Sequence, residues 1–183
     1  MDNGASSYRR YLNGDESAFR EIVQAYSDSL IFFIDRYVHD LSAAEDIALD
    51  AFTDLVVNRH RYTFKTSLKT YLFMIGRSRA LDYIKHRGKL TMVELSEAVE
   101  IPSCGLSLEE LVLADQRKLA VNRAMAQLSD ELRDVVYLVY FEQLSCDEAA
   151  KVMKKNRKQV YNLLYRAKNA LRAILGEEGE LLI

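Results

Sequence analysis

One segment near the C-terminal end of the chain concentrates side chains that bind nucleic acid. Between Lys151 and Arg172 the sequence has eight lysine or arginine residues and no acidic residue. Lysine and arginine neutralise phosphates, whereas asparagine, tyrosine and charged side chains also hydrogen-bond to base edges in the major groove. We therefore predict that this segment binds DNA. The expected DNA-contacting side chains are Arg157, Lys158, Tyr161, Asn162 and Tyr165, with Arg166 and Lys168 placed on phosphates.

Two short helices joined by a tight turn would present these side chains. Ser145 and Glu148 have the spacing of a capping box that starts the first helix, and Asn156 with Gln159 repeats it at the second. Apolar residues then recur every three or four positions, which indicates a buried stripe opposite the basic face. This pattern is typical of a helix-turn-helix. The predicted stripe consists of Val160, Leu164, Ala167 and Leu171.

A basic face on a single amphipathic helix is more often just solvated, and this alternative has to be weighed. Two features argue against it here. The basic helix follows a capped helix across a short turn, and the small residues Ala149 and Ala150 permit the close crossing of two helices.

The composition is that of an ordinary globular protein, but the charged residues are unevenly distributed along the chain. The chain has 183 residues, 49% of them hydrophobic and 28% charged, and a net charge of −2. The charge is unevenly distributed, because residues 59–89 carry nine basic residues against Asp82, whereas residues 90–116 carry six acidic residues and no basic one. Two basic blocks separated by an acidic one suit two DNA contacts joined by a segment that avoids DNA.

Several classes of protein receive no support from the sequence. It contains no uncharged apolar run of about 18 residues and no secretion signal, so we expect a cytoplasmic protein. Cys104 and Cys146 are isolated from each other and from the three histidines, so we expect no metal and no cofactor.

The periodicity predicts an all-α fold of two helical domains joined by a flexible linker. We place the first domain at 1–89, the linker at 90–108 around Pro102, and the second domain at 109–183. The expected helices of the first domain run over about 16–38, from a capping box of Ser42 and Glu45, and over about 67–86 with Gly88 as a stop. The second domain should hold helices over 111–128 and 129–142 and the helix-turn-helix.

These pieces, in this order, resemble the bacterial RNA polymerase sigma factors of the extracytoplasmic-function (ECF) type, which have only the second and fourth sigma domains. Residues 44–52 resemble the polymerase-binding helix, residues 67–85 the helix that melts and reads the downstream promoter element, and residues 144–171 the reader of the upstream element. The sequence departs from the family at four positions. Tyr71 replaces a usual Trp, Ser78 a frequent Asn, Lys154 a turn Gly, and Leu163 a frequent Arg.

The resemblance implies that core RNA polymerase and promoter DNA are partners, along with an anti-sigma factor that is commonly membrane-anchored. It also implies a promoter-specific initiation factor that has no small-molecule substrate and is not an enzyme. The residues expected to bind polymerase are acidic: Glu45, Asp46, Asp50 and Asp54. The residues expected to bind the downstream element, where aromatic stacking and phosphate neutralisation combine, are Lys65, Lys69, Tyr71, Arg77, Ser78 and Arg79.

Two other functions are conceivable. A stand-alone helix-turn-helix regulator would keep the C-terminal features and need no polymerase. A helical hydrolase could use the carboxylates of residues 45–54, but the sequence has no histidine at ligand spacing, no nucleophile with its base and no glycine-rich phosphate loop.

Overall fold

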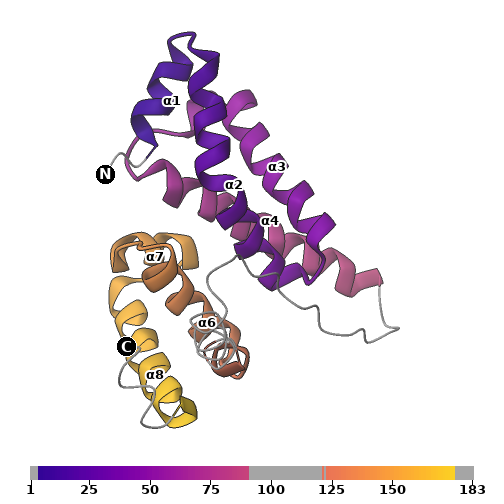
Figure 1. Cartoon of the computed structure of the whole chain (residues 1–183). Helices are drawn as coiled ribbons and strands as arrows, with labels where there is room; N and C mark the ends of the chain where they lie inside the picture. Colours follow the sequence, from indigo (N-terminus) through magenta and orange to yellow (C-terminus); the bar gives the residue numbers. More distant parts are fainter. Residues whose placement is uncertain (1–3, 91–120, 122, 176–183) are drawn as a thin grey trace, which may run out of the picture. The chain divides into compact units, whose positions relative to one another are not determined.

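The computed structural model describes residues 4–90, 121 and 123–175 (Figure 1). Every regular element among these residues is helical, which confirms the all-α prediction. The chain divides into two compact units, residues 1–99 and 100–183, and the boundary falls inside the segment predicted as a linker. Most of that segment lies outside the described residues, so the linker and the exact domain limits stay predictions.

Four α-helices build the N-terminal unit: α1 (Ala5–Leu12), α2 (Glu16–Val38), α3 (Leu41–Val57) and α4 (Leu68–Leu90). A 3₁₀ turn, η1 (Arg59–Arg61), follows α3. Helix α2 packs against each of the other three helices, as Figure 1 shows. Its residues Leu30, Phe33 and Ile34 are fully buried, and the centres of the Phe33 ring and the Phe73 ring of α4 lie 5.0 Å apart.

The close packing of α2 side chains against the backbone of α4 explains one glycine in this core. A Cβ atom at Gly76 in α4 would lie 2.9 Å from Cδ1 of Leu30 and 3.2 Å from Cδ1 of Ile34, both in α2. Any larger residue would therefore require the Leu30 and Ile34 side chains or α4 itself to shift, so Gly76 permits the close packing of α4, which carries predicted DNA contacts, on α2.

The structure adds one helix to the prediction for this unit and corrects two helix boundaries. Helix α1 was not predicted, because its sequence is polar and buries only Tyr8. The capping box of Ser42 and Glu45 is wrong, since Asp40 is the N-cap of α3 and its carboxylate accepts a hydrogen bond from the Ala43 amide at 3.1 Å. Aspartate caps as well as serine does, and it comes two residues earlier. The expected stop at Gly88 is also wrong, because α4 continues to Leu90.

The C-terminal unit contains α6 (Asp130–Val136), a π-helical turn η2 (Tyr137–Phe141), α7 (Cys146–Met153) and α8 (Arg157–Leu175). The helix expected over 129–142 is thus α6 continued by η2. Arg133 fixes the chain before α6, because its guanidinium donates hydrogen bonds to the carbonyl oxygens of Met125, Ala126 and Leu128 at 3.0–3.1 Å. Most of the helix expected over 111–128 lies outside the described residues.

The helix-turn-helix is confirmed in its local geometry. Helix α7 begins with the Ser145–Glu148 capping box. It ends at Lys154, whose φ of 53° is left-handed, and the Lys155 amide bonds back to the Ala150 carbonyl at 2.9 Å. This is the C-cap geometry that glycine adopts most easily, so Lys154 makes the same turn as the family's glycine at some cost in strain. Across the described part of the chain, no helix has the length and apolarity needed to cross a bilayer.

Candidate nucleic-acid and partner interfaces

Helix α8 separates an apolar face from a polar one. The predicted buried stripe of Val160, Leu164, Ala167 and Leu171 is confirmed, and Leu163 joins it with 6% of its surface exposed. Leu163 therefore packs inside the unit at a position where the family often has an arginine. Leucine at this position therefore contributes to the core and does not lie on the exposed face of α8.

The exposed face of α8 carries six of the seven predicted DNA contacts. Tyr161 and Tyr165 are 48% and 70% exposed, which is unusual for large aromatic side chains. Lys168 differs, because it is only half-buried and its Nζ lies 5.6 Å from the centre of the Tyr140 ring of η2. The structure thus places Lys168 beside η2. Those six exposed residues are Arg157, Lys158, Tyr161, Asn162, Tyr165 and Arg166.

Arg157 is held in place at the first turn of α8. Its Nη2 donates a hydrogen bond to the Tyr161 hydroxyl at 3.2 Å, and its Nε lies 3.6 Å from the Asp147 carboxylate of α7. The hydrogen bond to Tyr161, and then the charge of Asp147, raise the pKa of Arg157. These contacts orient the guanidinium and the phenol together at the N-terminal end of the helix, where a recognition helix meets base edges.

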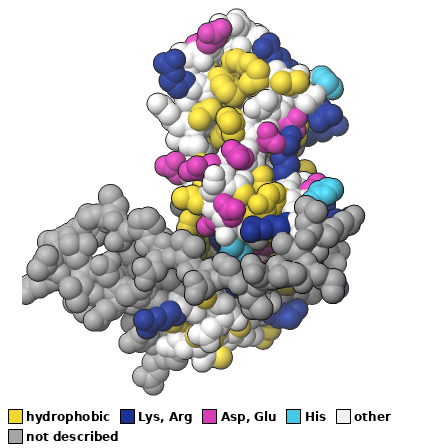
Figure 2. Space-filling view, turned by 90° about the vertical axis from the view of Figure 1, so that its right-hand side faces the viewer, with side chains coloured by type: hydrophobic (Ala, Val, Ile, Leu, Met, Phe, Trp, Pro, Cys, Tyr) yellow, Lys and Arg dark blue, Asp and Glu magenta, His cyan; other side chains and the backbone are white. Residues whose placement is uncertain are grey.

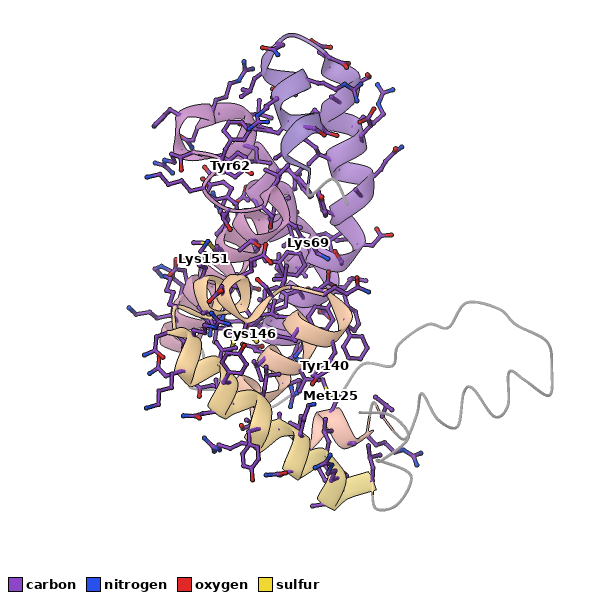
Figure 3. All side chains as sticks on the ribbon, turned by 90° about the vertical axis from the view of Figure 1, so that its left-hand side faces the viewer. Tyr62, Lys69, Met125, Tyr140, Cys146 and Lys151 are labelled. Atoms are coloured by element: carbon purple, nitrogen blue, oxygen red, sulfur yellow. The ribbon has the colours of Figure 1, made fainter. Side chains whose placement is uncertain are left out.

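An aromatic cluster supports the segment that precedes α4. Tyr62 is 4% exposed, its hydroxyl donates to the Thr66 carbonyl oxygen at 2.8 Å, and burial raises its pKa to about 12. The Tyr71 ring, which takes the place of the family's tryptophan, is half-buried at 5.1 Å from the Tyr62 ring. Tyr62 is labelled in Figure 3. Tyr62 therefore belongs to the core, and Tyr71 rests on it with one part accessible.

The predicted downstream-element contacts do not share one face of the N-terminal unit. Lys65 is exposed in the loop before α4, whereas Lys69, Arg77, Ser78 and Arg79 are half-buried on α4. The Arg77 Nε donates to the Tyr37 hydroxyl of α2 at 3.0 Å. Arg79 points the other way and contacts α3. The structure therefore splits the two arginines between the neighbouring helices.

Arg79 forms ion pairs with two of the carboxylates predicted to bind polymerase. Its Nη1 lies 2.9 Å from Oδ2 of Asp50, and its Nη2 lies 3.3 Å from Oδ2 of Asp54. Asp54 also accepts a hydrogen bond from Asn58 Nδ2 at 2.6 Å and lies 3.8 Å from Arg61. The Asp54 side chain is 16% exposed, so it belongs to an internal network rather than to the outer acidic face.

The outer face of α3 is acidic and apolar at once. Glu45, Asp46 and Asp50 are exposed, and Leu49 between them is 65% exposed, as is Leu41 at 58%. Figure 2 shows acidic and hydrophobic side chains next to one another on this unit. Sequence reasoning missed Leu49, although it stands outside the buried positions of α3 and so could have been found from the periodicity. We call Glu45, Asp46, Leu49 and Asp50 the α3 outer face.

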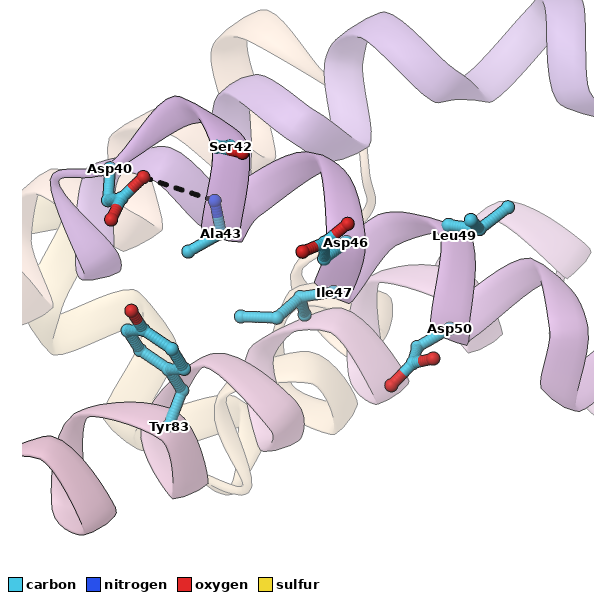
Figure 4. A pocket seen from close by; sticks show the side chains of 8 residues that line it. All are labelled: Asp40, Ser42, Ala43, Asp46, Ile47, Leu49, Asp50 and Tyr83. Atoms are coloured by element: carbon cyan, nitrogen blue, oxygen red, sulfur yellow. Dashed lines mark hydrogen bonds between the residues drawn. The ribbon is translucent and has the colours of Figure 1, made fainter.

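An open cleft of about 570 Å³ borders this face (Figure 4). Tyr83 projects from α4 toward α3 across the cleft, and Asp46, Leu49 and Asp50 line the α3 side. No group of His, Cys, Asp or Glu side chains suited to a metal ion occurs among the described residues. Both acidic and apolar side chains line the cleft, a mixture that is also found on protein-binding surfaces.

These features define a class: a two-unit helical DNA-binding protein with a helix-turn-helix in one unit and an exposed acidic helix face in the other. Two family models match the chain, Sigma-70 region 2 over residues 22–90 and Sigma-70 region 4 over residues 118–171. The first covers α3 and α4, and the second covers the helix-turn-helix.

Curated relatives and solved structures agree with this class. The chain is 25% identical over 161 residues to the ECF RNA polymerase sigma factor SigM of Bacillus subtilis, covering 84% of this chain and 93% of that protein. It is 27% identical over 170 residues to the RNA polymerase sigma-H factor of Pseudomonas aeruginosa, covering 88% of each. The fold resembles the sigma factor RpoE of Bartonella quintana, solved with the anti-sigma factor NepR, with a TM-score of 0.68, 21% identity and coverage of 87% and 98%.

A second solved structure has a similar fold. This is CnrH in complex with the cytosolic domain of CnrY, with a TM-score of 0.66, 18% identity and coverage of 95% of this chain and 97% of that one. The chain belongs to the bacterial RNA polymerase sigma factors of the ECF type. It is an initiation factor that directs RNA polymerase to promoters.

Proposed function

We propose that three surfaces of this sigma factor divide the work of initiation. The α3 outer face binds core RNA polymerase, α4 and the loop before it hold the downstream promoter element, and the N-terminal turns of α8 read the upstream element. The observation that carries the proposal is the exposure of six polar and basic side chains on capped α8, in one chain with an exposed acidic face on α3.

The polymerase contact follows from the chemistry of the α3 outer face. Exposed carboxylates at Glu45, Asp46 and Asp50 favour a basic partner surface, and Leu49 adds apolar area that gains free energy when covered. Asp54 contributes indirectly, because it is largely covered and holds Arg79, Asn58 and Arg61. We therefore assign Asp54 to positioning rather than to direct contact.

The downstream contact requires a surface that prefers separated DNA strands. A sigma factor makes and breaks no covalent bond, so it acts by binding open promoter DNA better than closed DNA. Tyr71, seated on the buried Tyr62 ring, offers a partly accessible aromatic face for an unstacked base, and Lys65 and Lys69 lie close in sequence to neutralise phosphates. Because tyrosine is smaller than tryptophan, this stacking area is smaller than that of relatives with tryptophan here.

Regulation by an anti-sigma factor is part of the proposal. Two solved structures of this fold are complexes, one of the sigma factor RpoE with the anti-sigma factor NepR and one of CnrH with the cytosolic domain of CnrY. By analogy, we propose that this chain is held in the cytoplasm by a protein inhibitor that covers one or more of the same surfaces. The exposed apolar side chains of Leu49 and Phe141, at 65% and 55%, are suited to such a cover.

Run-off transcription tests the function directly. Purified chain is added to core RNA polymerase with genomic fragments as templates, and transcript starts are mapped. We expect discrete starts that require both the chain and the polymerase, with polymerase alone giving none of them. If the chain produced no start on any fragment while a known sigma factor did so in parallel, the proposed function would be rejected.

A further inference from the structure

The contact of Arg79 with Asp50 joins two surfaces that have separate roles in the proposed function. Asp50 belongs to the α3 outer face, whereas Arg79 lies on α4, the helix that holds the downstream element. The two side chains form an ion pair across the α3–α4 interface, at 2.9 Å between Nη1 and Oδ2. The Arg79 side chain is 35% exposed and the Asp50 side chain is 63% exposed, so solvent and partners reach both.

The guanidinium of Arg79 divides its two terminal nitrogens between two different carboxylates. Nη2 lies on Asp54, which is 16% exposed and is also held by Asn58 and Arg61. This second contact is fixed by its surroundings. Nη1 lies on Asp50, which is 63% exposed and lines the cleft together with Asp46 and Tyr83 (Figure 4). The contact with Asp54 therefore anchors the Arg79 side chain, whereas the contact with Asp50 can be replaced by another partner.

A basic partner that engages Asp50 competes with Arg79 for the same carboxylate. When Asp50 turns to that partner, Nη1 of Arg79 loses its anion, while Nη2 stays on Asp54. A guanidinium with an open nitrogen, held in a fixed orientation on α4, is well suited to bind a DNA phosphate. In the free chain, by contrast, Asp50 neutralises Arg79 and places a negative charge where a phosphate would come.

We propose that Arg79 is a DNA-contacting residue that couples polymerase binding to DNA binding, and that Asp50 masks it until polymerase is bound. This rests on the proposed function, because it takes the α3 outer face as the polymerase surface. The ligand that Arg79 acquires is a backbone phosphate of the downstream promoter strand. Exposed ion pairs are weak, so the mask should reduce DNA affinity by a small factor, about threefold at low salt.

The test uses the free full-length chain and a DNA probe that needs no promoter sequence. Binding of a fluorescent single-stranded oligothymidylate of 20 nucleotides is measured by anisotropy for wild type, Asp50→Asn and Asp46→Asn. The two variants remove the same charge from exposed positions one helical turn apart, but no ion pair to Asp46 is found among the described residues. The loss of a negative charge should raise the DNA affinity of both variants by the same factor. Asp50→Asn should bind about threefold more tightly than Asp46→Asn, because it also releases Arg79.

A double variant separates Arg79 from general charge effects. In the Asp50→Asn, Arg79→Gln chain the extra gain should disappear, and affinity should fall to that of the Asp46→Asn, Arg79→Gln chain. Equal affinities for Asp50→Asn and Asp46→Asn would overturn the proposal, as would an extra gain that persists without Arg79. Circular dichroism confirms that each variant is folded.

Failure of this proposal can be told apart from failure of the proposed function. The binding assay contains no polymerase, so its result does not depend on initiation activity. A wild-type chain that initiates transcription, together with equal affinities of the two Asn variants, would reject the masking alone. A chain that fails to initiate would instead reject the assignment of the α3 outer face that the proposal uses.

Discussion

Asn156 and Gln159 hydrogen-bond to each other reciprocally at the start of α8. The Gln159 amide donates to Oδ1 of Asn156 at 2.8 Å, and the Asn156 amide donates to Oε1 of Gln159 at 2.8 Å. The pair satisfies two backbone donors and so fixes the first turn, on which Arg157 and Lys158 stand.

Replacing Asn156 by alanine should therefore destabilise the C-terminal unit by about 1 kcal/mol. The loss should be visible as faster amide hydrogen exchange in the first turn of α8. Asn169→Ala is the matched control, because Asn169 is exposed in the middle of the same helix and alanine is a better helix former there. If both variants exchanged at the same rate in the first turn, the cap would have no such role.

Lys158→Ala combined with Asn162→Ala should abolish promoter-specific binding while the chain still associates with polymerase. Both side chains are exposed on the first two turns of α8, whereas the α3 outer face belongs to the other unit. Losing two base or phosphate contacts costs about 1–3 kcal/mol each, which is enough to erase a footprint. Footprinting of the polymerase complex on its promoter measures this, with co-purification as the second readout.

Arg172→Ala is the control for charge alone, since Arg172 is exposed near the far end of α8. It should weaken binding on all DNA sequences by a similar, smaller factor. A double variant that still protected the upstream element would show that another element reads it.

The helix-turn-helix could be predicted almost completely from the sequence, because its signals are local. Both capping boxes place donor and acceptor three residues apart, and the apolar spacing of α8 specifies its buried face. Lys154 adopted the expected turn without the glycine. Helix α1, by contrast, gave no sequence signal, since it is stabilised mainly by packing Tyr8 into a core made by distant residues.

Charge contacts between helices could not be predicted. Asp50 and Arg79 are 29 residues apart, and their pairing depends on how α3 crosses α4, which no local pattern specifies. Sequence reasoning therefore assigned Asp50 and Asp54 to one partner and Arg79 to another. In the structure, Arg79 instead forms ion pairs with both Asp50 and Asp54. The same limit explains why Arg77 and Arg79, two residues apart, contact different helices.

The exposed Leu49 provides a test of the polymerase surface that leaves its charged groups intact. Leu49→Ala should weaken association with core polymerase about tenfold, because covering a leucine side chain contributes roughly 1.5–3 kcal/mol and alanine loses most of it. Co-purification and competition with a second sigma factor measure the affinity.

Val57→Ala is the control in the same helix. Val57 is 69% exposed, similar to Leu49, but lies eight residues further along α3, a rise of about 12 Å. It should leave the affinity near that of wild type. An equal loss in both variants would mean that the contact covers the whole of α3, and no loss in either would remove Leu49 from the interface.

The buried hydroxyl of Tyr62 should make the N-terminal unit sensitive to alkaline pH. Burial raises the pKa of Tyr62 to about 12 in the folded chain, against about 10 in the unfolded chain. The protonated phenol therefore stabilises the fold fully below pH 10, and this contribution is lost as the pH rises from 10 to 12. Over that window the free energy of unfolding should fall by up to about 1.4 kcal/mol per pH unit from this group.

Tyr62→Phe removes the titrating group together with its hydrogen bond to the Thr66 carbonyl oxygen. At pH 7 the variant should be less stable than wild type by about 1 kcal/mol. At pH 11 that difference should shrink or change sign, because only wild type must retain a proton on a buried phenol. Urea unfolding at pH 7, 9 and 11 measures both values. Tyr165→Phe, whose ring is 70% exposed, should differ from wild type by the same small amount at each pH. A gap between Tyr62→Phe and wild type that stayed constant from pH 7 to 11 would show that the Tyr62 hydroxyl is solvated in the fold.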